Sequence, residues 1–168
     1  SVLIEKATFP RDKVCGDALS GKVIRTLERL DEELALSVKQ HSERMPSWGV
    51  TFIAPNGKAL RVPFSRETGT GEAPGAILPR LTFDTLLFEK VIRTESVPVI
   101  EGIGATNFDR TANGWHISAK DPRLSTTARI ILDASGANST FSRHSAKLPM
   151  EPQHNAAGVR AYYAGVSG

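Results

Sequence analysis

The sequence predicts an α/β fold that carries an inserted antiparallel β-sheet. Apolar residues recur at helical spacing in two stretches, residues 18–41 and 82–94. Short apolar or β-branched runs lie before, between and after them, and two pairs of these runs are joined by Asn-Gly turns, which are typical of antiparallel hairpins. Because the two kinds of stretch alternate irregularly, we expect helices and strands to share one scaffold.

The N-terminal part of this scheme is a strand followed by a helix. A strand is expected at residues 2–4, where an apolar run stops at Glu5. The helix over 18–41 starts at a cap formed by Asp17 or Ser20, because short polar side chains accept hydrogen bonds from the first backbone N–H groups of a helix. Its apolar face contains Leu19, Val23, Leu27, Leu30 and Leu34.

Pro46 separates this helix from an expected β-hairpin. Strands at 48–53 and 59–63 flank Pro55-Asn56-Gly57, a sequence typical of a tight turn. Residues 65–76 are rich in glycine and are expected to form a flexible loop.

The second half of the chain is expected to contain a helix and then a series of strands. The helix over 82–94 has Thr82 or Asp84 near its start. A turn at Asn113-Gly114 joins one pair of strands. The expected strands are 97–101, 103–109, 114–120, 129–133 and 157–166.

The composition is that of an ordinary globular protein. A chain of 168 residues is usually one domain, and its single cysteine excludes an internal disulfide. The net charge of +3 is scattered along the chain and does not favour nucleic acid as a partner. The chain starts within a strand pattern and stops just after another, so we expect a piece of a larger protein, or a chain that is ordered only in part.

Charged residues follow the first expected strand. In dinucleotide-binding βαβ folds, an acidic residue at such a strand end accepts hydrogen bonds from ribose hydroxyls, so Glu5 is either a ribose ligand or a surface residue. Arg11 and Lys13 follow closely and are either phosphate ligands or two solvated charges.

The only cysteine lies in the same stretch, as Cys15-Gly16. Gly16 has no side chain and therefore lets a ligand approach the backbone. Neighbouring cations would lower the pKa of the Cys15 thiol and favour the thiolate. The alternative is that Cys15 is a small buried apolar side chain, and the pattern leaves both interpretations open.

Small residues occupy 133–139, directly after the expected strand at 129–133. At the carboxyl end of a strand, they fit the ligand crevice of an open α/β sheet, where backbone N–H groups bind an anion. The alternative is an ordinary strand-to-helix turn capped by Ser139. The sequence contains no Gly-x-Ser-x-Gly elbow, Gly-x-Gly-x-x-Gly motif or Walker loop, and its histidines lack metal-ligand spacing with Cys15.

Four motifs in this order resemble the geranylgeranyl reductase group of FAD-dependent oxidoreductases, which has the para-hydroxybenzoate hydroxylase fold. The motifs span nearly the whole chain and are 2–6 followed by 9–16, 79–86, 131–139 with Arg143 after it, and 158–163. The resemblance implies a partial FAD-binding Rossmann-like domain over 1–45 and 76–150, with an antiparallel β-sheet substrate domain over 46–75 and 151–168.

The resemblance also implies roles for individual residues. Glu5 would bind the adenosine ribose of FAD, Arg11 would lie near its phosphates, and Arg80 would reach the ribityl–pyrophosphate region. Cys15 would border the isoalloxazine ring and act as the catalytic residue, by protonating or positioning the substrate. The implied cofactor-binding residues are Glu5, Lys6, Arg11, Cys15, Gly16, Arg80, Asp133, Ser135 and Gly136.

The implied activity is the transfer of a hydride from reduced FAD to a carbon–carbon double bond of an isoprenoid-like or other apolar substrate. The expected electron donor is NAD(P)H or a ferredoxin, and the expected location is cytoplasmic, with peripheral contact to a membrane. One alternative is hydroxylation or halogenation of an aromatic substrate by a flavin-dependent monooxygenase or halogenase, and another is a non-catalytic fragment or binding domain. Ser135 stands where the family motif has aspartate, which favours reductase-like and halogenase-like members over hydroxylases.

Two motifs of such enzymes lie outside these 168 residues: a glycine-rich phosphate loop before Glu5 and a Gly-Asp motif after the last strand. The phosphate loop supplies the helix N-terminus that neutralises the pyrophosphate. We therefore expect an internal fragment that is inactive and binds FAD weakly or not at all by itself, although the complete protein binds it.

Overall fold

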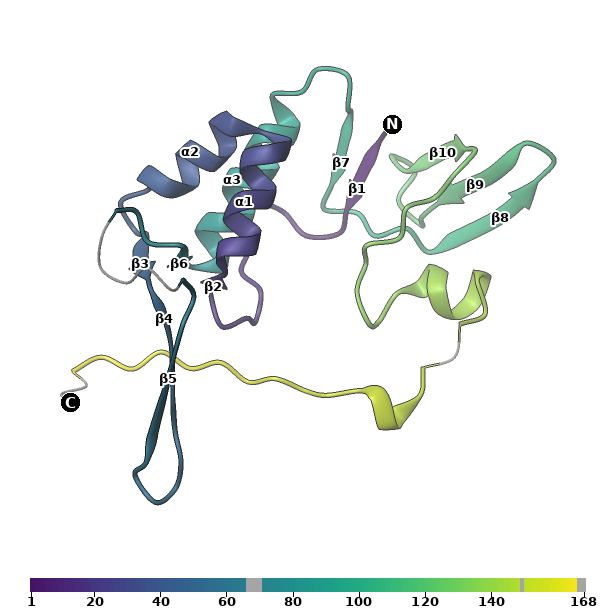
Figure 1. Ribbon diagram of the computed structural model, residues 1–168. Helices are drawn as coiled ribbons and strands as arrows, with labels where there is room; N and C mark the ends of the chain where they lie inside the picture. The colour runs from purple at the N-terminus through teal and green to yellow at the C-terminus, as the bar shows by residue number, and fades with distance from the viewer. Residues whose placement is uncertain (66–70, 149, 166–168) are drawn as a thin grey trace. The chain divides into compact units, whose positions relative to one another are not determined.

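A computed structural model describes residues 1–65, 71–148 and 150–165. The fold is mixed α/β with several antiparallel sheets, as predicted (Figure 1). The chain divides into two compact units, of which unit 1 contains residues 1–9 and 92–157 and unit 2 contains residues 10–91 and 158–168. The division into domains 1–45 with 76–150 and 46–75 with 151–168 stays a prediction.

Unit 1 contains one parallel strand pair and one antiparallel sheet. β1 (Leu3–Glu5) pairs in parallel with β7 (Val99–Glu101). Because parallel strands need a long crossover between them, this pair has the connectivity of a Rossmann-like sheet. In the antiparallel sheet, β9 (Gly114–Ser118) lies between β8 (Asn107–Thr111) and β10 (Ser125–Ala128).

Gly114 is required at the turn between β8 and β9. Its φ is +141°, and a Cβ at this position would lie 2.3 Å from the carbonyl oxygen of Ala128 on β10. Glycine therefore lets β10 approach β9. The predicted turn at Asn113-Gly114 is confirmed, and Ile117 and Leu124 form part of the buried core of this unit.

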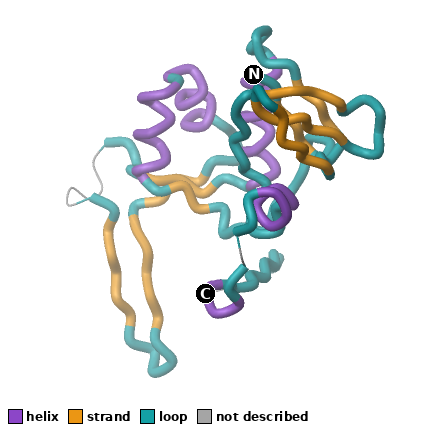
Figure 2. Tube along the Cα trace, turned by 90° about the vertical axis from the view of Figure 1, so that its right-hand side faces the viewer, coloured by secondary structure: helices purple, strands orange, loops and turns teal. Residues whose placement is uncertain are grey.

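Unit 2 consists of three helices, a three-stranded antiparallel sheet of order β2-β6-β3, and a separate hairpin of β4 and β5 (Figure 2). The helices are α1 (Gly21–Leu30), α2 (Glu32–Gln40) and α3 (Arg80–Ile92), and the strands are β2 (Ala18–Leu19), β3 (Met45–Ser47), β4 (Gly49–Ile53), β5 (Ala59–Pro63) and β6 (Gly75–Ile77). The hairpin confirms the predicted strands at 48–53 and 59–63.

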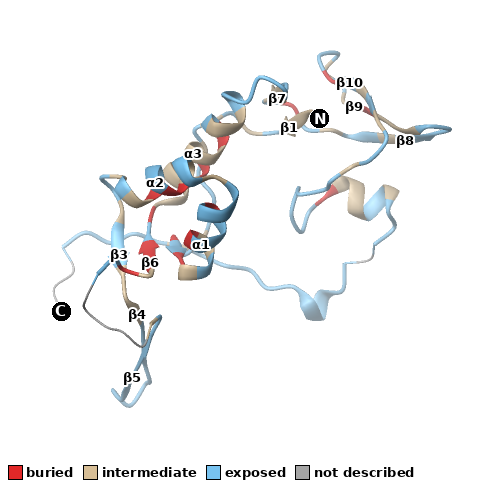
Figure 3. Cartoon of the chain, turned by 45° about the horizontal axis from the view of Figure 1, so that its top comes forward, coloured by how far each residue is buried: buried red, intermediate tan, exposed pale blue. Residues whose placement is uncertain are grey.

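The core of unit 2 lies where α1 and α2 pack on the short sheet (Figure 3). Val38 and Leu78 are completely buried in it. The other buried members are Leu19, Ile24, Leu27, Ala35 and Ala76.

The predicted helix over 18–41 is interrupted at Asp31, which ends α1 and begins α2. Asp31 has an extended backbone, and its carboxylate accepts a hydrogen bond from the N–H of Leu34 at 2.9 Å. An aspartate that binds a nearby backbone N–H in this way competes with the helix and favours a cap. Leu30, expected on the apolar face, is therefore displaced from it and is 78% exposed.

Two predicted strands are wrong. Residues 129–133 and the described part of 157–166 form no strand, and Ile130 and Leu132 are exposed. A strand needs a partner for its backbone N–H and C=O groups, and both edges of β9 are already paired, with β8 and with β10. The predicted loop at 65–76 lies partly outside the described residues, and its end forms β6.

No helix among the described residues is long and apolar enough to cross a membrane.

Candidate functional site

Asp84 on α3 holds two arginines in unit 2. Arg80, one helical turn earlier, donates from Nε to Oδ1 at 2.8 Å and from Nη2 to Oδ2 at 2.9 Å. Arg11, from the loop between β1 and β2, donates from Nη1 to Oδ2 at 2.8 Å. The Asp84 side chain is only 6% exposed, whereas about a quarter of each arginine side chain reaches solvent. The cluster therefore gathers two guanidinium groups on one carboxylate, and guanidinium groups are suited to bind an anionic group such as a phosphate.

Cys15 belongs to the same part of unit 2. Its pKa lies below the ordinary value, chiefly because the Arg80 side chain donates a hydrogen bond to it and also because the backbone N–H groups of Asp17 and Gly16 point to the sulfur. Partial burial opposes this effect. These donors favour ionisation of the Cys15 thiol.

Asp17 connects the Cys15 turn to α3. Its φ of +57° is in the left-handed region, and its side chain is buried. Oδ1 accepts a hydrogen bond from the N–H of Arg80, the first residue of α3, at 3.1 Å, and the carbonyl oxygen of Asp17 accepts one from Leu78 N–H at 2.9 Å. Asp17 therefore caps α3 and not the first helix, for which Ser20 is the N-cap. This cap also explains why α3 begins two residues before the predicted start.

Glu5 and Lys6 lie in unit 1, at the carboxyl end of the parallel pair. Glu5 is half-buried and accepts a hydrogen bond from Ala7 N–H at 2.9 Å, while Lys6 is exposed. Glu101 on β7, which lies opposite Glu5 in the strand pair, accepts a hydrogen bond from the N–H of Phe9. Carboxylates at the carboxyl ends of parallel strands are placed as acceptors for the hydroxyl groups of a ligand.

The Asp133 carboxylate organises the turn that follows β10. Its Oδ1 accepts hydrogen bonds from the N–H and the hydroxyl group of Ser135, and its Oδ2 accepts from the hydroxyls of Ser139 and Ser142, both at 2.5 Å. These donors lower the pKa of Asp133 far below its ordinary value. The carboxylate thus turns toward its own loop, and Gly136 adopts the positive φ of +82° that the loop requires.

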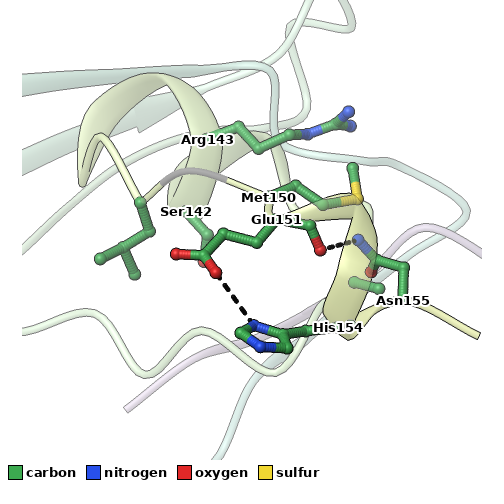
Figure 4. A pocket seen from close by; sticks show the side chains of 9 residues that line it. Ser142, Arg143, Met150, Glu151, His154 and Asn155 are labelled. Carbon is green, nitrogen blue, oxygen red and sulfur yellow. Dashed lines mark hydrogen bonds and ion pairs between the residues drawn. The ribbon is translucent and has the colours of Figure 1, made fainter.

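A cavity of about 390 Å³ lies beside this turn in unit 1 (Figure 4). Its lining includes Gly136, Ser142, Glu151 and His154. The Glu151 carboxylate and His154 Nδ1 lie 3.1 Å apart and point toward one another.

The structure divides the predicted cofactor-binding residues between the two units. Unit 2 brings Arg11, Cys15 and Arg80 together around Asp84, and Gly16 contributes a backbone N–H. Unit 1 holds the remainder in two separate groups of hydrogen bonds, one at Glu5 and Lys6 and one at Asp133, Ser135 and Gly136.

Several polar residues of these groups were not predicted. The spacing of four between Arg80 and Asp84 could have revealed their ion pair, because such residues are neighbours on a helix. Glu101, Arg160 and Tyr162 gave no comparable signal, since their partners are far away in the sequence.

Comparison with known proteins gives one relative and several similar structures. No protein-family model matches the chain. Conditioned medium factor receptor 1 of Dictyostelium discoideum is 28% identical over 174 residues, which cover 95% of this chain and 32% of the receptor. The chain therefore spans about a third of the length of this curated relative.

The similar structures include flavoproteins. PqsL of P. aeruginosa has a TM-score of 0.73 at 16% identity, with 89% of this chain and 40% of PqsL covered. The myxobacterial FAD-dependent halogenase CndH has a TM-score of 0.63 at 21% identity, with 82% and 32% covered. A flavoprotein/dehydrogenase from Cytophaga hutchinsonii has a TM-score of 0.60 at 22% identity, with 76% and 31% covered. The chain thus has the fold of part of these three proteins.

Proposed function

We propose that this chain is part of an FAD-dependent oxidoreductase and supplies several of its cofactor-binding residues. The observation that carries the proposal is the fold, which the chain shares over most of its length with an FAD-dependent halogenase and a flavoprotein/dehydrogenase. The two guanidinium groups gathered at Asp84 are independent support, because FAD carries a pyrophosphate.

The residues of the chain fit such a cofactor in chemical character. In unit 2, Arg11 and Arg80 would bind its anionic part, while Asp84 keeps both guanidinium groups oriented. In unit 1, Glu5 would accept hydrogen bonds from ribose hydroxyls, with Lys6 beside it, and the turn at 133–136 would offer backbone N–H groups. The chemistry that bound FAD would supply, once reduced, is hydride transfer to a substrate or reaction with oxygen.

The chemistry that we favour is reduction of a carbon–carbon double bond in an apolar, isoprenoid-like substrate. After hydride transfer to one carbon, the other carbon needs a proton. A thiol whose pKa is lowered gives up its proton more readily than an ordinary one, so Cys15 is the proposed general acid. NAD(P)H or a ferredoxin would reduce the flavin, in a cytoplasmic enzyme that touches a membrane surface.

The cofactor is tested on the complete natural polypeptide that carries this sequence. We expect the purified protein to show a flavin absorbance band, and an Arg80→Met variant to bind FAD at least tenfold more weakly, because a charge-assisted hydrogen bond contributes about 1.5–3 kcal/mol. Arg29→Met, at an exposed position of α1, is the matched control. A protein that never binds FAD, even when FAD is added, would overturn the proposal.

The second candidate chemistry is hydroxylation or halogenation. It is favoured by the halogenases CndH, PltM and CmlS among the similar structures, with TM-scores of 0.63, 0.64 and 0.57. Anaerobic turnover of an isoprenoid would support the reductase. Oxygen consumption with halide incorporated into an aromatic substrate would support the halogenase. A Cys15→Ala variant should slow the reductase reaction and leave FAD binding in place.

A third candidate is a binding domain without catalysis. The Dictyostelium relative is named a receptor, which supports this candidate. A complete protein that binds FAD but turns over neither class of substrate would favour it.

A further inference from the structure

Residues 158–163, in the yellow part of Figure 1, contact the loop that carries Cys15, within unit 2. Arg160 makes most of this contact. Its guanidinium group donates to the carbonyl oxygen of Lys13 at 3.1 Å and to Asp17 Oδ1 at 3.3 Å, and it pairs with the Asp12 carboxylate. The Arg160 side chain is only 15% exposed, although the segment belongs to no helix or strand.

Tyr162 makes the second contact. Its hydroxyl group donates to Asp17 Oδ2 at 2.5 Å, and the Arg160 guanidinium lies 4.7 Å from the centre of its ring. The neighbouring side chains are exposed to solvent instead: Val159 is 97% exposed and Tyr163 is 81% exposed. Alternate side chains of an extended chain point to opposite sides, so one side of the segment faces the loop.

Both oxygens of Asp17 are consequently occupied by other parts of unit 2. Oδ1 accepts from Arg80 N–H and from Arg160, and Oδ2 accepts from Tyr162. A non-glycine residue in the left-handed region is maintained only when the surrounding contacts determine it. At Asp17 these contacts come from α3 on one side and from the C-terminal segment on the other.

We propose that residues 158–163 form a strap that holds the Cys15 turn in place, with Arg160 and Tyr162 as positioning residues for the thiol. The strap holds the turn on both sides of Cys15, at Asp12 and Lys13 before it and at Asp17 after it. Release of the strap frees Asp17 to leave the left-handed conformation, and the donors that favour the thiolate are then no longer held around the sulfur.

The consequence is a change in the titration of Cys15. The charged and titratable groups of the turn and of the elements against it include Arg11, Asp12, Lys13, Asp17, Arg80, Asp84, Arg160 and Tyr162. Arg80 is held by Asp84 and stays in place without the strap, so part of the thiolate stabilisation remains. The pKa of the thiol should therefore rise part of the way toward its ordinary value when the strap is released.

The experiment uses the fact that the chain has one cysteine, so that alkylation by iodoacetamide reports on a single thiol. Rates are measured without added cofactor over a pH series that brackets the midpoint, for Arg160→Gln and Tyr162→Phe. The matched controls are Arg29→Gln and Tyr163→Phe, at exposed positions of the same unit. We expect a higher midpoint and a faster high-pH plateau in both strap variants and no change in the controls. If the midpoint rises by half a pH unit, the fraction of thiolate at a pH below the midpoint falls about threefold.

Profiles of both strap variants that coincide with those of the controls would overturn the proposal. Circular dichroism shows whether each variant is folded, and if Arg160→Gln is unfolded then Tyr162→Phe, which removes a single oxygen, decides. The strap is independent of FAD in this assay. Its failure leaves the cofactor proposal intact, and a complete protein without FAD leaves the strap intact.

Discussion

The Asp84 cluster predicts a large loss of stability when the carboxylate is neutralised. In Asp84→Asn, an amide oxygen at the Oδ2 position still accepts from both arginines, but the amide NH₂ group then faces the Nε–H donor of Arg80. The two largely buried guanidinium groups then lose the carboxylate that they share. We therefore expect unit 2 to unfold at lower denaturant concentration.

The magnitude follows from the exposure of the three side chains. Removing one partner of a fully buried ion pair costs about 3–5 kcal/mol. Because Arg11 and Arg80 are 26% and 21% exposed, water hydrates part of the stranded charge. This reduces the expected loss to about 2–4 kcal/mol, which moves the urea midpoint by about 1–2 M for an ordinary small domain.

The assay is urea unfolding followed by the helical circular dichroism signal, because α1, α2 and almost all of α3 belong to unit 2. Asp121→Asn is the control. Because Asp121 pairs with Arg123 on the surface, this substitution should lower the free energy of unfolding only slightly. Adding Arg11→Met to Asp84→Asn should recover part of the stability, because it removes one stranded charge. A loss below about 1 kcal/mol for Asp84→Asn would refute the reasoning, since that is the size of a surface ion pair.

Three further predictions concern other parts of the chain. Gly114→Ala should destabilise unit 1 by about 1–3 kcal/mol, because the added Cβ meets Ala128, and unfolding followed by Trp115 fluorescence measures this. An unchanged midpoint would contradict the close approach of β10. The Asp133 carboxyl should titrate below 3.8 in an NMR experiment, so its contribution to stability is present above the unfolded pKa and disappears as the pH falls through the lower folded pKa. Ser139→Ala removes one donor and should raise that midpoint, and an unmoved midpoint would count against the hydrogen bond. The chain alone should bind FAD weakly or not at all by fluorescence titration, and a yellow purified chain would disprove this.

Local patterns predicted the elements whose stability is local. The hairpin of β4 and β5 follows from its Asn-Gly turn, and α3 follows from its apolar spacing. The pattern failed where a side chain competes with the backbone, as at Asp31, and where a strand needs a partner, as at 129–133. Neither event depends on apolar spacing, so the spacing could not reveal it.

The candidate site was predicted in part. Arg11, Cys15 and Arg80 were singled out by residue type and by resemblance, and the structure brings them together around Asp84. Their roles toward FAD stay predictions. The carboxylate at their centre was interpreted only as a residue near a helix start, because its buried position depends on a loop 73 residues earlier.

The sequence by itself determined the α/β class, the two hairpin turns and the residue types available for an anionic cofactor, because each of these depends on neighbours within a few residues. Only the tertiary structure decided which aspartate serves which partner. Asp17 and Arg160 are 143 residues apart, and Asp17 could equally have capped the helix that follows it. The choice rests on the path of the chain, which brings the start of α3 and the C-terminal segment to the same carboxylate. The chain has many carboxylates and many donors, and a hydrogen bond forms only between groups that lie within about 3 Å of each other. Residue type therefore does not determine which pair forms, and the fold does.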